Sequence, residues 1–257
     1  MNRIPLFRIP GFSVKLTVSV LFFMTSISAF GAQFQGFGGQ NRFTPSNRID
    51  KLILSNFAKK SITPADICTD EVFIRRAYLD VIGTLPEAEV VERFLRNPRR
   101  DKRKTLIDKL LQRPEYADYW SLKWCDILRV KSEFPINLWP NAVQAYHRWI
   151  LDSLSENMPY DEFVRQLLTT SGSNFRHPQV NFYRAIQGKK PSAIASAAAL
   201  NFMGVRFEKW PQSRQKGMEA FFSRVAYKGT AEWKEEIVYL DPEPVTPLKA
   251  VFPDGTA

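Results

Sequence analysis

The sequence predicts an all-α fold, an irregular multi-helix domain with at most one short strand near the C-terminus. Apolar residues recur at helical spacing through most segments between residues 46 and 240, and only residues 236–240 resemble a strand. The composition is globular, since 44% of the 257 residues are hydrophobic and 13% are aromatic. With 12 glycines and two cysteines, the chain is neither a collagen nor a disulfide-built scaffold.

The first helices are predicted from apolar periodicity and from end signals. Apolar residues at i, i+3, i+4 and i+8 within residues 49–57 predict a helix with one buried face. Thr69-Asp70-Glu71 offers an N-cap and first-turn acids for a helix that runs to residue 82, where Gly83 is a natural stop. The next helix covers residues 87–96 and ends at Asn97-Pro98.

The middle of the chain continues the helical pattern. Leucines and an isoleucine within residues 106–111 mark a helix that stops before Pro114. Residues 116–128 carry a strongly aromatic stripe at helical spacing, and residues 141–157 repeat the pattern. A short helix follows over residues 161–168.

The last third is predicted to be less regular. Residues 169–190 form a polar, irregular stretch, residues 192–203 a helix of small residues suited to close packing, and residues 212–225 a last helix. Four prolines make residues 241–257 a proline-rich linker or tail.

The N-terminus has the features of an export signal. Residues 1–31 combine basic residues without acids, an apolar stretch over residues 16–30 and a small-residue ending, so they predict a secretory signal peptide. Residues 32–45 should be a flexible lead-in to the helical domain at 46–240. We therefore expect an exported protein of the periplasm or cell envelope, with no transmembrane span after cleavage of the signal; an uncleaved anchor is the alternative.

The charge favours an acidic partner. The net charge is +10, and without residues 1–31 it stays near +7, from 33 basic and 26 acidic residues. For an exported chain, this predicts an acidic envelope polymer, an anionic lipid surface or an acidic protein as the partner, and no nucleic acid. The densest basic cluster, residues 99–104, is interpreted as a solvated loop.

The two cysteines leave two possibilities open. Cys68 and Cys125 are 57 residues apart and would lie in an oxidising compartment, where a disulfide could persist. Two buried free thiols fit equally well, because each cysteine lies in an apolar pattern read as helical.

The search for reactive motifs identifies no reaction. His147 and His177 have no second ligand at metal spacing, and no Cys-x-x-Cys-His element is present for a haem. Nucleophile elbows and phosphate-binding loops are missing as well. The sequence thus predicts no cofactor and favours a noncatalytic role.

Carboxylates near aromatic residues keep a hydrolytic or carbohydrate-active role open as an alternative. That role would place Asp126 or Asp161 beside Trp124 or Trp149, with two acids facing each other in a cleft. The simpler interpretation is a helix-surface ion pair between Asp126 and Arg129, with the tryptophans buried in the core.

Three ordered motifs resemble a known family. The first motif, residues 73–86, is an arginine-rich helix that leads into a Gly-x-x-Pro turn. The second is similar to a Trp-Asp-Leu-Arg helix and comprises Arg113 to Tyr116, Trp120 and residues 123–129. The third, residues 159–165, matches Pro-Tyr-Asp-x-Phe-Val-Arg. The chain resembles the cytochrome-associated domain of unknown function 1549 of exported planctomycete-type proteins. Eight residues of these motifs are our candidate functional surface: Arg75, Arg76, Asp80, Trp124, Asp126, Arg129, Asp161 and Arg165.

The resemblance implies an exported helical domain that is often fused to a cytochrome c module and followed by a partner domain of family 1553. It implies no established activity. Here residues 202–210 lack the Cys-x-x-Cys-His element of many relatives, and we expect this chain to be without the partner domain. The leading hypothesis is therefore a binding or assembly module for a partner domain or envelope polymer, and an accessory role in a cytochrome c electron-transfer assembly is a further alternative.

Overall fold

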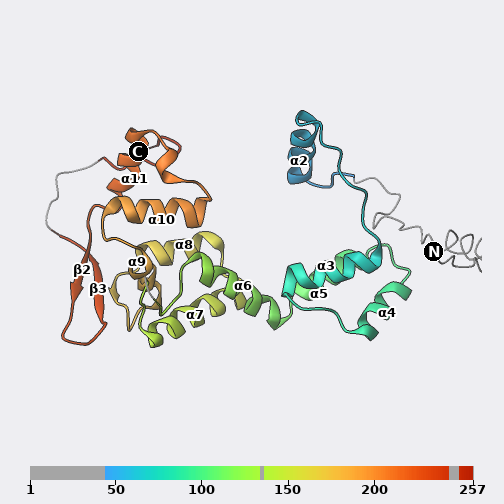
Figure 1. The fold of residues 1–257 in the computed structure, drawn as a ribbon, viewed down its shortest axis with the longest axis horizontal. Helices are drawn as coiled ribbons and strands as arrows, with labels where there is room; N and C mark the ends of the chain where they lie inside the picture. The colour runs from blue at the N-terminus through green and yellow to red at the C-terminus, as the bar shows by residue number, and fades with distance from the viewer. Residues whose placement is uncertain (1–43, 134–135, 243–248, 257) are drawn as a thin grey trace, which may run out of the picture. The chain divides into compact units, whose positions relative to one another are not determined.

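The computed structural model describes residues 44–133, 136–242 and 249–256 (Figure 1). The chain divides into two compact units, Met1–Val72 and Phe73–Ala257. The predicted signal peptide and nearly all of the predicted lead-in lie outside the described residues.

The first unit contributes helix α2, Arg48–Lys59. Asn47 caps its N-terminus in a capping box, because its side chain accepts from the Asp50 backbone N–H at 2.9 Å and Asp50 bonds back. The predicted buried face is wrong, since no residue of α2 is buried and Ile49 and Leu52 are 67% and 61% exposed. The apolar period fixes a helix but not its packing partner, and α2 is the one helix that the structure describes before residue 60.

Three helices at the start of the second unit share a small core. They are α3 (Asp70–Ile82), α4 (Ala88–Arg96) and α5 (Lys102–Leu111), close to the predicted ranges. Gly83 follows α3 with a left-handed φ of 70°, as its place after the apolar run predicts. The core consists of Ile74, Ala77, Tyr78, Ile82, Phe94 and Leu110.

The next three helices carry the aromatic side chains. Two of them, α6 (Pro114–Ile127) and α7 (Pro140–Ser155), begin with a proline, whose fixed φ and missing N–H suit the first helical position. The third, α8 (Tyr160–Thr169), supplies Phe163, which stacks on Trp149 with ring centroids 4.9 Å apart. These helices occupy their predicted positions.

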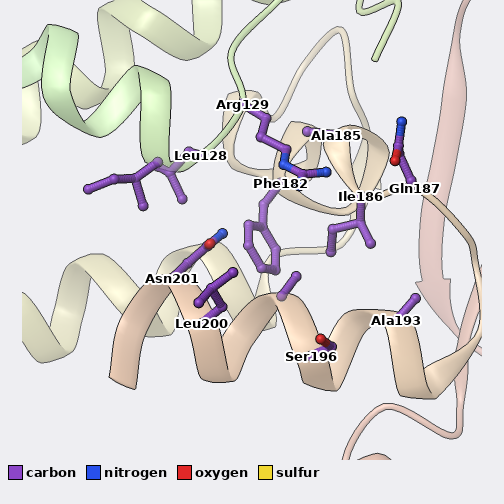
Figure 2. A pocket seen from close by; sticks show the side chains of 12 residues that line it. Leu128, Arg129, Phe182, Ala185, Ile186, Gln187, Ala193, Ser196, Leu200 and Asn201 are labelled. Carbon is purple, nitrogen blue, oxygen red and sulfur yellow. The ribbon is translucent and has the colours of Figure 1, made fainter. Parts of the chain in front are cut away.

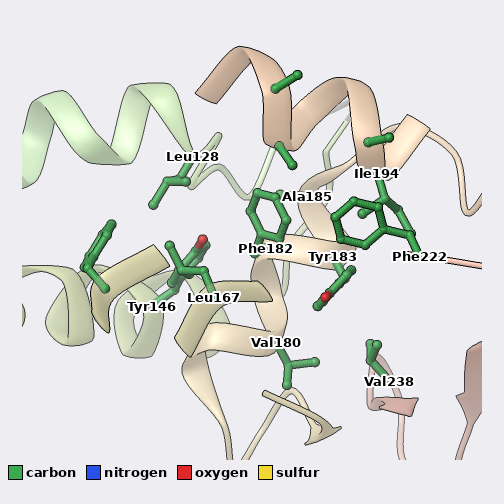
Figure 3. Close-up of a cluster of buried hydrophobic side chains, with 14 of the residues drawn as sticks. Leu128, Tyr146, Leu167, Val180, Phe182, Tyr183, Ala185, Ile194, Phe222 and Val238 are labelled. Atoms are coloured by element: carbon green, nitrogen blue, oxygen red, sulfur yellow. The ribbon is translucent and has the colours of Figure 1, made fainter. Parts of the chain in front are cut away.

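The remaining helices close the larger core (Figure 3). The predicted irregular stretch contains the 3-10 turn Pro178–Val180 and α9 (Asn181–Ala185), and it is followed by α10 (Pro191–Met203). After the 3-10 turn Phe207–Lys209, α11 (Gln212–Ala220) ends five residues before the predicted end. The larger core includes Leu128, Tyr146, Ile150, Phe163, Leu167, Val180, Phe182, Tyr183, Ile194, Phe222 and Val238.

The fold is mostly helical, as predicted, but the expectation of at most one strand is wrong. Strand β3 (Glu236–Leu240) matches the predicted strand and lies at the centre of an antiparallel sheet in the order β1-β3-β2. Its neighbours are β1 (Gly172–Ser173) and β2 (Val225–Gly229). β1 has two residues and pairs with a segment more than 60 residues away, so no local pattern marks it.

The described part of the predicted tail contacts α11. The Val251 N–H donates to the Gly217 carbonyl oxygen at 3.2 Å, and the rings of Phe221 and Phe252 lie 4.8 Å apart. These contacts hold residues 249–256 against the helix. The predicted turn chemistry is present, with a turn over residues 253–255.

Candidate functional site

The structure spreads the predicted functional surface over three helices, α3, α6 and α8, and the turn that follows α6. Arg75, Arg76 and Asp80 are exposed on α3, whereas Asp161 and Arg165 are exposed on α8. In the part of the chain that the structure describes, one ion pair joins two of the eight residues, from Arg165 to Asp161 at 3.5 Å within α8. The surface therefore stays a prediction, since the described residues do not gather it into one site.

Trp124 belongs mainly to the core. Its ring lies 5.1 Å from the Phe163 ring and 6.1 Å from the Tyr160 ring, and the side chain is half-buried. These contacts favour packing of the tryptophan in the core over stacking of the ring on a sugar.

The two candidate carboxylates, Asp126 and Asp161, are exposed on two different helices. Neither lines the hollow beside α4 and α5 or the hollow beside α10, so neither hollow contains a paired-carboxylate site.

The predicted ion pair between Asp126 and Arg129 does not form in the described structure, because α6 ends at Ile127. Arg129 has a left-handed φ of 56°. Its N–H donates to the Asp126 carbonyl oxygen at 3.3 Å, and the Val130 N–H donates to the Cys125 carbonyl oxygen at 2.9 Å. These two bonds make a Schellman motif with arginine at the position usually held by glycine.

One serine and one histidine come close enough to be considered as a nucleophile and its base. Ser121 Oγ lies 3.4 Å from His147 Nε2. However, Ser121 is buried at 1% exposure, and its hydroxyl donates to the Asp118 carbonyl oxygen at 2.8 Å. A nucleophile needs access to a substrate, so this pair is a packing contact.

The two cysteines belong to different units of the chain. Cys68 lies in an extended segment before α3, which corrects the helical interpretation of its surroundings, whereas Cys125 lies in α6. The possible disulfide between Cys68 and Cys125 stays a prediction.

Burial raises the pKa of the Cys125 thiol to about 11, and the Asp126 carboxylate adds to the shift. Relative to the usual value near 9, this lowers the thiolate fraction at pH 8 about 100-fold. We expect iodoacetamide to alkylate Cys125 about 100-fold more slowly in the folded protein than in urea, as measured by mass spectrometry over time. Equal rates in the two states would contradict the buried thiol.

The largest concentration of charge lies beside α4 and α5. Residues 93–113 contain nine Arg or Lys and two Asp, a net charge of +7 out of the chain's +10. The predicted solvated loop at 99–104 is the turn between the two helices and the first turn of α5. In it, Arg99 pairs with Asp101 at 2.8 Å.

A cavity of about 470 Å³ opens between these helices, and we call it the basic pocket. It is lined by Tyr78, Val90, Arg93, Phe94, Asn97, Lys102, Thr105, Leu106, Lys109, Leu110 and Arg113. Four of these side chains are cationic and none is acidic. Phe94 and Leu110 form an apolar floor, because both are also members of the small core.

The four cations of the basic pocket differ in how they are held. Lys102 Nζ donates to the Phe94 carbonyl oxygen at 3.3 Å, and Arg113 bonds to Glu115, which raises the pKa of Arg113 and lowers the pKa of Glu115. Within the described chain, Arg93 and Lys109 have no ion-pair partner, and both are exposed. The pocket thus presents two fixed and two available positive charges to an anion.

A second hollow of about 560 Å³ lies between the end of α6, α9 and α10, and we call it the α10 groove (Figure 2). Its lining is mostly apolar with a few neutral polar groups, and Arg129 is its one charged residue. The lining residues are Ile127, Leu128, Arg129, Phe182, Ala185, Ile186, Gln187, Ala193, Ser196, Ala197, Leu200 and Asn201. Of these lining residues, only Arg129 belongs to the eight-residue functional surface that was predicted from the sequence.

Across the described ranges, no group of three or more His, Cys, Asp or Glu side chains could hold a metal ion. Within the same ranges, no helix has the length and apolar character to cross a bilayer.

Sequence comparison gives one match. A family model described as PSCyt2, protein of unknown function (DUF1549), matches residues 48–208, which is more than half of the chain. No curated protein and no solved structure matches the chain.

Proposed function

The chain belongs to the DUF1549 family, and from this premise we propose that it is a noncatalytic, exported binding module that holds an acidic polymer of the cell envelope at the basic pocket. The observation that carries the proposal is the pocket's lining of four cations and no acid. A polymer with a repeated carboxylate or sulfate would meet these charges over several units.

The geometry of the basic pocket supports attachment of a chain molecule over capture of a small ion. The exposed cations of the lining come from different parts of the chain, with Arg93 on α4, Lys109 on α5 and Arg113 just before α6. Further basic side chains, among them Arg100 and Lys104, continue outside the pocket and are exposed. Such a stripe gives a polyanion successive contacts, each weak because it is exposed to solvent.

The test is binding of polygalacturonate to the purified protein, with neutral dextran as the comparison polymer. We expect binding of polygalacturonate at about 0.01 M salt, a strong decrease at about 0.15 M salt, and no binding of dextran, because exposed charges are screened over about 8 Å at the higher salt. The double variant Arg93→Gln, Lys109→Gln should weaken binding roughly tenfold, since each exposed charge contact contributes up to about 1 kcal/mol.

A matched variant separates the pocket from the overall charge. Arg148→Gln with Lys216→Gln removes the same two charges from exposed positions on α7 and α11. We expect a loss of less than about twofold in this variant. An equal loss in both double variants, or binding that does not change with salt, would overturn the proposal.

A further inference from the structure

The α10 groove has the size and lining of a small-molecule site. Its volume of about 560 Å³ lies within the roughly 300–1,000 Å³ of typical ligand pockets, and it has room for on the order of ten to twenty non-hydrogen atoms. Apolar side chains dominate the lining, which also includes the neutral polar residues Gln187, Ser196 and Asn201. The groove is separate in the chain from the basic pocket, with no lining residue in common.

Helix α10 divides its small side chains between two faces. Ile194, Ala195, Ala198 and Ala199 are buried in the larger core. The other face, at the i, i+3, i+4 and i+7 spacing that begins at Ala193, lines the groove and ends at Leu200, which is 52% exposed. A strip of small side chains bordered by an exposed leucine lets an apolar body lie flat along the helix.

Arg129 contributes the only charge to this apolar groove. Figure 2 shows its side chain extending from the end of α6 toward Phe182 and α10. Among the described residues it has no ion-pair partner, and a single guanidinium on an apolar surface suits a bidentate bond to one carboxylate.

The backbone at Arg129 is a second, independent observation. Gly83 and Gly204 hold the left-handed position after α3 and α10, with φ of 70° and 65°. After α6 the chain places arginine there, which is conformationally costly for a side chain with a Cβ. Ser61 and Lys234 also have positive φ, so the strain alone identifies no site. At Arg129, however, the residue with the strained backbone also lines a cavity.

From these features we infer that the α10 groove binds an apolar monocarboxylate, with the carboxylate on Arg129 and the apolar body along the small-residue face of α10. Gln187 and Asn201 are further lining residues whose side-chain amides can donate hydrogen bonds to polar atoms of a ligand. Two sources share this chemistry, a free aliphatic acid and the C-terminal carboxylate of an apolar peptide. The inference does not rest on the proposed function, because the basic pocket lies elsewhere in the chain.

The experiment is titration calorimetry of the purified protein with two pairs of probes. Decanoate is compared with decanol, and a short peptide ending in two leucines is compared with its C-terminal amide. We expect at least one carboxylate to bind at least tenfold more tightly than its uncharged partner, and the pair that shows the difference identifies the source. If neither carboxylate exceeds its uncharged partner, the inference is overturned.

Variants of Arg129 test the assigned contact. Arg129→Gln should weaken carboxylate binding at least tenfold, and Arg148→Gln, which removes an exposed charge from α7, should leave it within twofold. Arg129→Gly should also abolish the preference for the carboxylate while raising the melting temperature, because glycine relieves the left-handed strain. A folded Arg129→Gly protein that binds decanoate as tightly as the unmodified chain would exclude Arg129 as the anchor. Polygalacturonate binding should be unaffected by both Arg129 variants, so the two proposals fail separately.

Discussion

Replacing Gly83 by alanine is expected to destabilise the protein by about 2–4 kcal/mol and to lower its melting temperature by roughly 5–15 °C. Gly83 has a φ of 70°, a region that residues with a Cβ rarely adopt. A Cβ built at this position would also lie 2.3 Å from Cδ2 and 2.6 Å from Cε2 of the Tyr119 ring. Either the turn after α3 or the ring on α6 would have to move.

The Tyr119 ring has little freedom to make room for that Cβ. It meets the Trp120 ring edge to face at 5.9 Å, and Lys123 Nζ lies 5.1 Å over its face. Trp120 in turn donates from its indole nitrogen to the Val81 carbonyl oxygen at 3.1 Å, two residues before the glycine. Displacing the ring would therefore disturb the contact between α3 and α6.

Gly204→Ala is the matched control for the Gly83 prediction. Gly204 has a φ of 65°, but no atom lies within 4 Å of an added Cβ, so alanine there should cost only the backbone strain, about 1 kcal/mol. Urea and thermal unfolding of the two variants would separate strain from overlap. A Gly83→Ala protein that is no less stable than Gly204→Ala would refute the close approach of Tyr119.

The helices were predictable because their signals are local. Apolar periodicity and end signals such as Gly83 act within a turn or two of the chain, and they place the helices close to their observed ranges. The sheet was only partly predictable, since β1 and β2 depend on pairing with β3. The exposure of α2 was unpredictable for a related reason: an amphipathic period says that a face is apolar, not what covers it.

The two hollows differ in how much of each the sequence reveals. The sequence shows the positive charge of the basic pocket as the run of basic residues from Arg93 to Arg113. The sequence does not show the cavity that some of these residues line. The α10 groove joins residues about 70 positions apart, from Ile127 to Asn201, so only tertiary structure assembles it. One local clue existed at Arg129, since α6 ends without the glycine that follows α3 and α10, but recognising it requires knowing where α6 ends.

Raising the pH from 8 to 11 is expected to lower the free energy of unfolding by roughly 4–6 kcal/mol, after the shifts of the partly exposed Cys125 and Tyr227 are discounted for solvent screening. Burial raises the pKa of Cys125 to about 11 and that of Tyr227 to about 12, and it raises the pKa values of Tyr146 and Tyr183 further above their usual range. Above pH 9 to 10 these groups lose their protons in the unfolded chain but keep them in the folded one. The folded state then binds more protons, so stability that is complete below pH 9 is lost between about pH 9 and 12.

The size of this loss is comparable to the whole stability of an ordinary domain, about 5–15 kcal/mol. Urea unfolding followed by fluorescence of the six tryptophans, at pH 8 and pH 11, would measure it. Return to pH 8 should restore the original midpoint if deprotonation is the cause. A midpoint that stays constant up to pH 11 would contradict the burial of these four side chains.

Two phenylalanine variants divide the alkaline loss among its sources and test the hydrogen bonding of each phenol. The Tyr183 hydroxyl donates to the Leu168 carbonyl oxygen, so Tyr183→Phe should cost about 1 kcal/mol at pH 8 by leaving that oxygen without its donor. The Tyr227 hydroxyl is buried with no hydrogen-bond partner among the described residues, so Tyr227→Phe should be neutral or stabilising at pH 8. At pH 11 both variants should recover about 1 kcal/mol, because a side chain without a phenol has no proton to lose. A Tyr227→Phe variant that is destabilised at pH 8 would instead indicate that this hydroxyl makes a hydrogen bond. That bond would then offset the cost of burying the hydroxyl near Glu236.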